Sequence, residues 1–176
     1  FDIALYLRLL ETLKPALIIE IGSAEGGSAL WFGEMGQLFN PDCKVHSFDL
    51  VPPEIASPSN VQFHFGDIHA LGQSEIHDLL GRRSGPVLVC EDGPHTYEGC
   101  LSALRFFGDL LEPGDYLVIE DGNLRDLGYF DLRNGPNRAI AQHQREAPRI
   151  FAEDRSLSDF YGRNVTWNTN GWLKRL

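Results

Sequence analysis

The chain is 176 residues long, which predicts a single domain over residues 1–176. Hydrophobic residues make up 43% of it and charged residues 23%, as is usual for a globular protein. No apolar stretch approaches the roughly 20 residues that cross a bilayer. The formal net charge of −10, with no local cluster of Lys or Arg, argues against a surface that follows phosphates. We therefore expect neither a membrane nor a nucleic acid as a partner.

Three cysteines, Cys43, Cys90 and Cys100, show no CxxC spacing and predict free thiols in a reducing cytoplasm. A catalytic thiol at Cys90 is the weaker alternative. No signal peptide is visible, and the chain opens at Phe1 rather than at methionine, so we expect a cytoplasmic protein and allow for an N-terminal extension. Without a secretory signal, we interpret the glycosylation sequon Asn164-Val165-Thr166 as a chance match.

Strand-like and helix-like segments alternate along the chain. In chain order the patterns predict a helix at 3–13, a strand at 16–21, a helix at 28–39, strands at 45–49 and 61–65, a helix at 75–80, a strand at 86–90, a helix at 97–111, a strand at 116–119, a helix at 136–146, and strands at 149–153 and 165–176. This order predicts the α/β class, with a doubly wound, mostly parallel Rossmann-like sheet. The last two strands are expected to close the sheet as an antiparallel C-terminal pair.

A glycine-rich loop follows the first predicted strand, where a doubly wound fold binds its nucleotide. The dinucleotide pattern GxGxxG fails at Ala24, the phosphate pattern lacks its Lys after Gly27, and Glu25 would repel a pyrophosphate. S-adenosylmethionine (SAM) suits such a loop, because it has a ribose, a positive centre and a carboxylate for backbone N–H groups, but no phosphate. The predicted cofactor residues of this loop are Glu20, Gly22, Ser23, Gly26 and Ser28. A mere chain reversal is the alternative.

Two further acids end the next strands. Asp49 is placed to accept hydrogen bonds from two ribose hydroxyls, a geometry that SAM enzymes share with NAD enzymes. Asp67, after the third strand, is predicted to approach the adenine, or alternatively to cap the following helix.

Acidic residues also follow the fourth and fifth predicted strands, in Cys90-Glu91-Asp92-Gly93-Pro94-His95-Thr96 and Val118-Ile119-Glu120-Asp121-Gly122. Because parallel strands end at the same edge of a sheet, three carboxylates should converge there and bind a hard cation such as Mg²⁺. The predicted metal ligands are Asp92, Glu120 and Asp121. His95 lies three residues beyond Asp92 and is a candidate base. The alternatives are that these acids cap helices or form turns.

Residues 122–136 form a long connection that is rich in Gly and Asn and begins at the predicted metal site. Such connections are commonly lids or binding loops. We expect this one to close over a substrate, with Tyr129 and Phe130 excluding water; an ordinary surface loop is the alternative.

Taken together, these motifs resemble the cephalosporin hydroxylase/rhamnosyl O-methyltransferase family, which is related to macrocin-type sugar O-methyltransferases. The resemblance runs from about residue 15 to the end and rests on ExGxxxGGS at 20–28, Asp49, Asp92-Gly93-Pro94-His95-Thr96-Tyr97-Glu98, Pro113-Gly114 and Gly171-Trp172-Leu173-Lys174-Arg175. It implies a class I SAM-dependent methyltransferase fold and the use of Mg²⁺. It also implies that Asp92, Glu120 and Asp121 bind the metal and that His95 is the general base. Members of the family usually carry further N-terminal elements that shape substrate binding and oligomers, so a homo-oligomer is open.

The sequence thus predicts a Mg²⁺- and SAM-dependent O-methyltransferase with His95 and Asp92 as catalytic residues. Its expected partner is a small hydroxylated acceptor, with a sugar of a glycosylated natural product as the leading class. One alternative is a nicotinamide-dependent oxidoreductase or hydroxylase component. The other is a non-catalytic binding subunit with a SAM-type fold.

Overall fold

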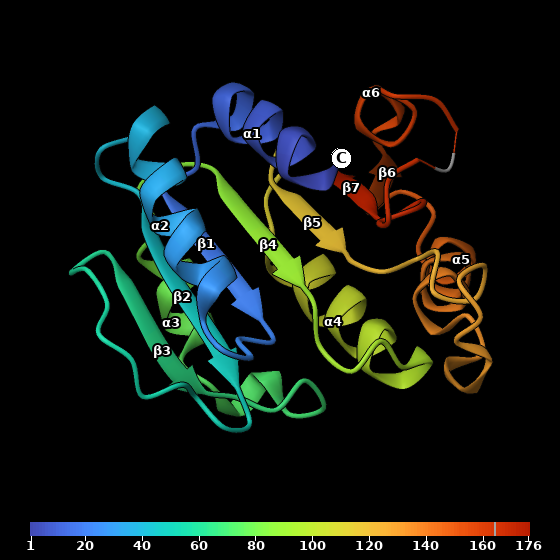
Figure 1. Cartoon of the computed structure of the whole chain (residues 1–176), viewed down its shortest axis with the longest axis horizontal. Coiled ribbons are helices and arrows are strands. Elements are labelled where there is room, and N and C mark those ends of the chain that lie inside the picture. The colour runs from blue at the N-terminus through green and yellow to red at the C-terminus, as the bar shows by residue number, and fades with distance from the viewer. Residues whose placement is uncertain (164) are drawn as a thin grey trace.

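Seven strands form one sheet in the order β3-β2-β1-β4-β5-β7-β6 in the computed structural model, which describes residues 1–163 and 165–176 (Figure 1). The strands are β1 (Leu17–Ile21), β2 (Lys44–Asp49), β3 (Val61–Phe65), β4 (Val87–Glu91), β5 (Tyr116–Ile119), β6 (Phe151–Glu153) and β7 (Trp172–Arg175). Strands β1 to β5 run parallel, whereas β7 is antiparallel to both β5 and β6. The predicted fold class and the antiparallel C-terminal pair are confirmed.

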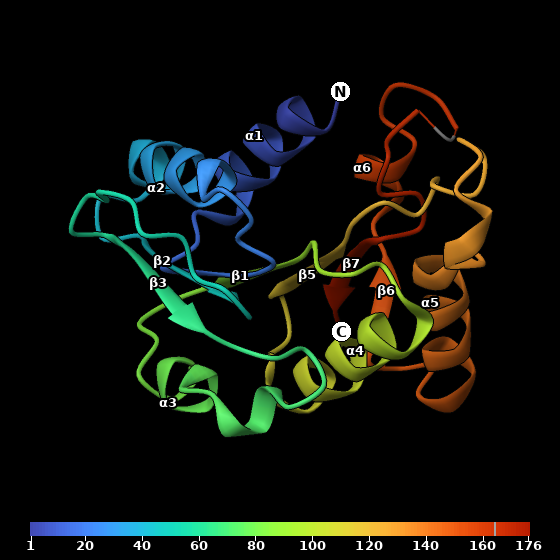
Figure 2. The same cartoon turned by 60° about the horizontal axis from the view of Figure 1, so that its bottom comes forward.

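Helices cover both faces of the sheet (Figure 2). One face carries α1 (Asp2–Leu13), α2 (Gly27–Phe39) and the short α6 (Arg155–Ser158), and the other carries α3 (Ile76–Gly81), α4 (Tyr97–Leu110) and α5 (Gly135–Glu146). Short 3₁₀ turns lie at Leu71–Gln73 and Phe130–Leu132. No described helix is both long and apolar enough to cross a bilayer.

Two hydrophobic clusters hold these layers together, one on each side of the sheet. Successive strand residues alternate between them: Ile19 and Leu117 pack toward α3 and α4, while Ile18 and Val118 pack toward α1 and α2. Both faces of the central strands are therefore buried from solvent. This explains why β1, β4 and β5 are buried at every position and do not alternate between buried and exposed residues.

The strand order reverses between β1 and β4, since β2 and β3 lie on one side of this pair and β5 on the other. Loops leaving the carboxyl ends of β1 and β4 therefore diverge and leave a crevice between them. Every acid that the sequence marked at a strand end lies along this edge.

The C-terminal region departs from the prediction in two ways. The expected strand at 165–176 is a strand only over Trp172–Arg175, and the helix α6 was not predicted. Residues 166–168 bond to side chains instead of to a neighbouring strand: the Trp167 N–H donates to Asp2 (3.1 Å) and the Asn168 N–H donates to Thr166 (3.1 Å). Asn164, the first residue of the sequon, lies outside the described residues.

Candidate active site

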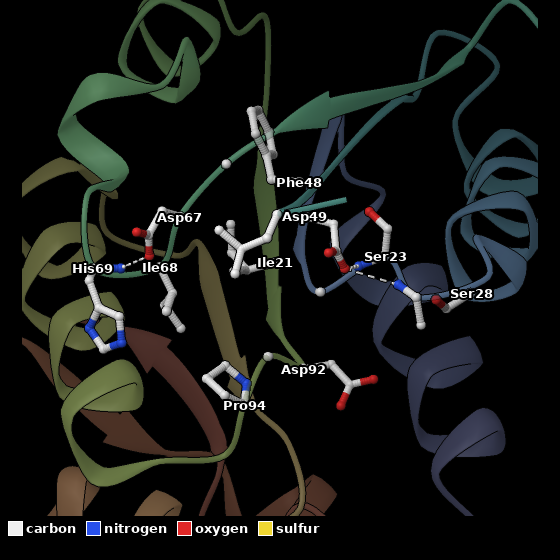
Figure 3. A pocket seen from close by; sticks show the side chains of 15 residues that line it. Ile21, Ser23, Ser28, Phe48, Asp49, Asp67, Ile68, His69, Asp92 and Pro94 are labelled. Carbon is white, nitrogen blue, oxygen red and sulfur yellow. Dashed lines mark hydrogen bonds between the residues drawn. The ribbon is translucent and has the colours of Figure 1, made fainter. Parts of the chain in front are cut away.

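A cavity of about 470 Å³ opens at the carboxyl ends of β1, β2, β3 and β4 (Figure 3). Five of the predicted cofactor residues line it, namely Gly22, Ser23, Ser28, Asp49 and Asp67. Its volume lies in the usual range for a site that takes a small organic ligand. The cavity therefore coincides with the cofactor site that the strand order predicts.

The glycine-rich loop packs tightly against the end of β4. Gly22 has a φ of 100°, and a Cβ at this position would overlap the backbone of Asp92. Only glycine allows both this conformation and this approach. The close contact brings the cofactor loop and the acidic strand end to one rim of the cavity.

Asp49 organises the same loop from the end of β2. Its Oδ2 atom accepts hydrogen bonds from the backbone N–H groups of Ser23 (2.8 Å) and Ala24 (3.1 Å), as Figure 3 shows. Its Oδ1 atom accepts one from Val51 (3.0 Å). Partial burial opposes ionisation of Asp49, but these N–H donors outweigh it and lower the pKa of the carboxyl. Asp49 is thus a fixed anion on the cavity wall.

Two of the predicted cofactor residues do not line the cavity. Glu20 lies below the loop with 1% of its surface exposed, and it accepts a hydrogen bond from Ser47. Burial raises the pKa of Glu20, although bonds from Ser28 and Ser47 oppose that shift. Gly26 turns the chain into α2, packed under Ile55. Both residues support the loop from beneath.

Asp67 does line the cavity, and its Oδ1 atom accepts a hydrogen bond from the backbone N–H of His69 (2.8 Å). The alternative role as a helix cap is wrong, because Ala70 is the N-cap of the following 3₁₀ turn and Asp67 holds only the turn before it. The second oxygen has no such bond among the described residues, so contact with a ligand stays a prediction.

A compact group of Asp92, His95 and Asp121 lies at the ends of β4 and β5. One possible ligand atom from each residue lies within 4.8 Å of those of the other two. The His95 Nε2 atom is 3.4 Å from Asp121 Oδ2 and 3.7 Å from Asp92 Oδ1. The convergence of Asp92 and Asp121 with His95 agrees with the sequence prediction.

Glu120, the third predicted ligand, lies outside this compact group, so its role as a metal ligand stays a prediction. Its Oε1 atom instead accepts a hydrogen bond from the hydroxyl of Tyr6 on α1 (2.5 Å). The backbone explains the difference: Glu120 continues the alternation of β5 and faces the α1 side of the sheet, whereas Asp121 turns away from the strand.

The acids of this site are crowded and hard to ionise together. Burial raises the pKa of Asp92 to about 7, and the neighbouring charge of Asp121 adds to the shift. Burial likewise raises the pKa of Asp121 and of Glu120. Burial lowers the pKa of His95, although Asp121 opposes that shift. At neutral pH the site therefore holds a neutral imidazole among carboxyls that lack counter-charge.

Strained backbone surrounds the same residues. His95 (φ 52°) and Asp121 (φ 59°) both adopt the left-handed conformation, which is uncommon for residues other than glycine. Neither Asp92 nor Asp121 caps a described helix. Helix α4, which begins after His95, is capped by Thr96, whose hydroxyl accepts a hydrogen bond from the Gly99 N–H (3.1 Å). Strain of this kind is frequent at functional sites.

Sequence reasoning missed two residues that contact the acidic site. Tyr6 bonds to Glu120, and the buried Asn168 accepts a hydrogen bond from the Asp121 N–H (3.1 Å). Neither belongs to a local motif, so only three-dimensional proximity could have found them. Cys90, in contrast, is fully buried, and burial raises the pKa of its thiol well above the usual value, which argues against a nucleophile.

Fold and site together define a class: a Rossmann-like enzyme domain with a cofactor cavity beside an acidic centre. A family model described as "Rhamnosyl O-methyltransferase/CmcI" matches residues 1–176. The chain therefore belongs to the rhamnosyl O-methyltransferase/CmcI family and is an O-methyltransferase, which confirms the resemblance seen in the sequence.

Individual relatives agree with this assignment. The chain is 31% identical over 177 residues to a rhamnosyl O-methyltransferase of Mycobacterium leprae (strain TN), covering 97% of this chain and 76% of the relative. It is 28% identical over 178 residues to that of Mycobacterium tuberculosis (strain ATCC 25618 / H37Rv), covering 97% of this chain and 71% of the relative. A solved structure described as "cmcI-D160 Mg-SAM" superposes with a TM-score of 0.72 at 25% identity, covering 98% of this chain and 70% of the other. The nicotinamide and non-catalytic alternatives gain no support from these comparisons.

Proposed function

We propose that this protein transfers the methyl group of SAM to a sugar hydroxyl of a glycosylated metabolite, next to a bound Mg²⁺. The observation that carries the proposal is the place of Asp92. This residue lines the cofactor cavity and also belongs to the acidic group with His95 and Asp121. A methyl donor in the cavity and an acceptor at the acidic group would therefore meet.

The cavity fits SAM in three respects. Asp49 is an anion on its wall and suits ribose hydroxyls, which are hydrogen-bond donors. No side-chain oxygen caps the first turn of α2 among the described residues, and Ser28 of that turn lines the cavity. The free N–H groups of a helix start suit the carboxylate of SAM. A similar solved structure is described as a complex with Mg and SAM, and this similarity supports the same two ligands for this chain.

The acidic group fits Mg²⁺ through its donors. Carboxylate oxygens are the ligands that Mg²⁺ prefers, and Asp92 and Asp121 present two of them within 4.8 Å. The second oxygen of Glu120 could supply a third. A cation would also relieve the crowding that raises the pKa of these carboxyls.

The metal ligands, His95 and the Gly22 loop each have a separate role in the proposed reaction. Mg²⁺ bound there would supply the positive charge that lowers the pKa of an acceptor hydroxyl. His95, kept neutral by burial, accepts the proton of that hydroxyl at Nε2, and Asp121 stabilises the resulting imidazolium across 3.4 Å. The loop at Gly22 and the end of β4 hold donor and acceptor in line, and orientation of this kind provides much of the rate.

The acceptor class is supported by exposed aromatic side chains on two segments, the one that follows Asp121 and the one that precedes Asn168. Trp167, Tyr129 and Phe130 are each more than half exposed. The Trp167 carbonyl accepts a hydrogen bond from the N–H of Asn123, two residues beyond Asp121 (3.2 Å). Exposed aromatic rings pack well on the apolar faces of sugars and aglycones. The curated relatives are described as rhamnosyl O-methyltransferases, and we extend the sugar acceptor, though not the particular sugar, to this chain.

Transfer of labelled methyl from SAM to a panel of glycosides, in Mg²⁺ and in EDTA, tests the proposal. We expect methylated glycoside only in Mg²⁺, and loss of product in the His95→Ala variant while SAM still binds. Calorimetry with SAM and with NAD gives the matching binding result, with heat only for SAM. Binding of NAD without SAM, or full turnover in EDTA, would refute the proposal.

A further inference from the structure

Helix α1 contacts Glu120 directly and is linked to Asp121 through the segment at residues 166–168. Its residue Tyr6 donates a hydrogen bond to Glu120 (2.5 Å), although the two are 114 positions apart in the chain. Its first residue, Asp2, accepts the N–H of Trp167 (3.1 Å) and the hydroxyl of Thr166. These contacts hold the segment whose next residue, Asn168, binds the backbone of Asp121.

Tyr6 cannot move away from Glu120 without disturbing the core. The residue is 5% exposed, and its ring packs at 5.1 Å from that of Phe32 and at 4.8 Å from that of Trp172. Its hydroxyl therefore marks a fixed point in the structure. The bond engages Oε1 of Glu120 and leaves Oε2 for another partner.

Asn168 constrains the second acid through its backbone. Its side chain is fully buried, and its Oδ1 atom accepts the N–H of Asp121. Thr166 anchors it in turn, because the Thr166 hydroxyl accepts from both the Asn168 N–H (3.1 Å) and the indole N–H of Trp172 (3.1 Å). A residue at φ 59° persists only where its surroundings hold it, and this network provides that hold at Asp121.

We infer that Tyr6 and Asn168 are positioning residues of the metal site: Tyr6 orients the Glu120 carboxylate, and Asn168 holds Asp121 in the conformation that turns its side chain toward Asp92. Helix α1 is then part of the metal site although it supplies no ligand. The inference rests on the proposed function, since both concern the same metal. Outer partners of metal ligands commonly change metal affinity by about 10–100-fold when they are removed.

The test compares Tyr6→Phe with a matched control, Tyr116→Phe. Tyr116 is also buried and also bonds a carboxylate, since its hydroxyl donates to Asp154 (2.8 Å). It lies at the start of β5, whereas Glu120 follows the end of that strand. Both variants lose one hydroxyl from the same face of the sheet, so a purely structural effect should be similar in both.

Calorimetric titration with Mg²⁺ alone is the readout, with thermal unfolding measured in parallel. We expect Tyr6→Phe and Asn168→Ala to weaken Mg²⁺ binding at least about tenfold, and Tyr116→Phe to bind as the wild type does. In a double-mutant cycle, adding Tyr6→Phe to Glu120→Gln should cause no further loss, because Tyr6 acts through Glu120.

Equal Mg²⁺ affinity in Tyr6→Phe and wild type would overturn the inference, as would the same loss in Tyr116→Phe. Tyr6→Phe keeps the ring and its packing, so it tests the role of Tyr6 in the metal site even if Asn168→Ala unfolds. A wild type that binds no Mg²⁺ at all would refute the proposed metal together with this inference. Normal Mg²⁺ binding by every variant would refute the inference alone.

Discussion

Asp49 ends β2 and Asp92 follows β4, and both line the same cavity, yet their carboxylates lie in opposite environments. Backbone N–H groups surround Asp49 and lower its pKa, so it is a stable anion without any ligand. Asp92 has burial and other carboxylates around it, and its pKa rises to about 7. The cofactor side of the site is preorganised by the chain itself, whereas the acidic side needs an outside cation.

The comparison teaches that an acid at a strand end has no fixed role. The loop after β1 supplies N–H groups from Ser23 and Ala24 to Asp49, because the Gly22 turn directs them there. No backbone N–H donates to the Asp92 or Asp121 carboxylate among the residues described. Substitutions on the cofactor side should therefore affect SAM binding alone, and substitutions on the acidic side should affect Mg²⁺ binding alone.

The largest effect is expected from removing the metal or one of its ligands. EDTA, or Asp121→Asn with Mg²⁺ present, should lower turnover at least about a hundredfold while calorimetry still detects SAM. Asp121→Asn should leave the melting temperature equal or higher without metal, because it removes one repelling charge. Loss of SAM binding together with turnover would show that the two halves are not separate.

The opposite half is tested by Asp49→Ala. This change removes charge-assisted hydrogen bonds worth roughly 1.5–3 kcal/mol each, so SAM binding by calorimetry should weaken at least about tenfold. The loop at Ser23 and Ala24 also loses its anchor, and the free energy of unfolding should fall by about 1–3 kcal/mol. Mg²⁺ affinity should be unchanged, and a parallel loss of Mg²⁺ binding would contradict the division.

The pH dependence of stability should report the crowding at Asp92. Its folded pKa of about 7 lies above the ordinary value of 3.8, so the folded state binds more protons between these pH values. Stability of the metal-free protein should then fall as the pH rises from about 4 to 7. Mg²⁺ should raise the melting temperature more at pH 8 than at pH 5.5.

Differential scanning fluorimetry of wild type and Asp92→Asn measures this effect. Asp92→Asn removes the titrating group and should flatten the profile over that range. A wild-type profile that is equally flat would show that the Asp92 carboxyl is not crowded in solution.

The smallest effect concerns residues 122–136. Residues 125–131 are exposed, while Asn137 on α5 donates a hydrogen bond to the Gly122 carbonyl and holds the start of the segment. We expect hydrogen exchange at Tyr129 and Phe130 to slow only with SAM, Mg²⁺ and acceptor together. Equally slow exchange without ligands would identify a fixed wall rather than a lid.

Several parts of the site could be read from the chain alone, and others could not. The apolar runs before Asp92 and Glu120 predicted buried parallel strands, and parallel strands end at one edge of the sheet. The direction in which each side chain points after the strand ends could not be predicted in this way. Glu120 faces α1 and bonds to Tyr6, while Asp121 faces His95, and this division depends on one left-handed residue.

By itself, the sequence determined the order of the parallel strands and of the helices between them, the doubly wound sheet and the place of its acidic edge. Hydrophobic periodicity and turn residues act over short distances along the chain, so these features can be predicted locally. Tertiary structure alone decided which acid is a stable anion and which is crowded, since the pKa of a carboxyl depends on whatever packs against it. It also decided that α1 contacts the acidic site through Tyr6, a hydrogen bond between residues 114 positions apart. No local pattern encodes such a contact, because it exists only once the sheet brings both segments to the same face.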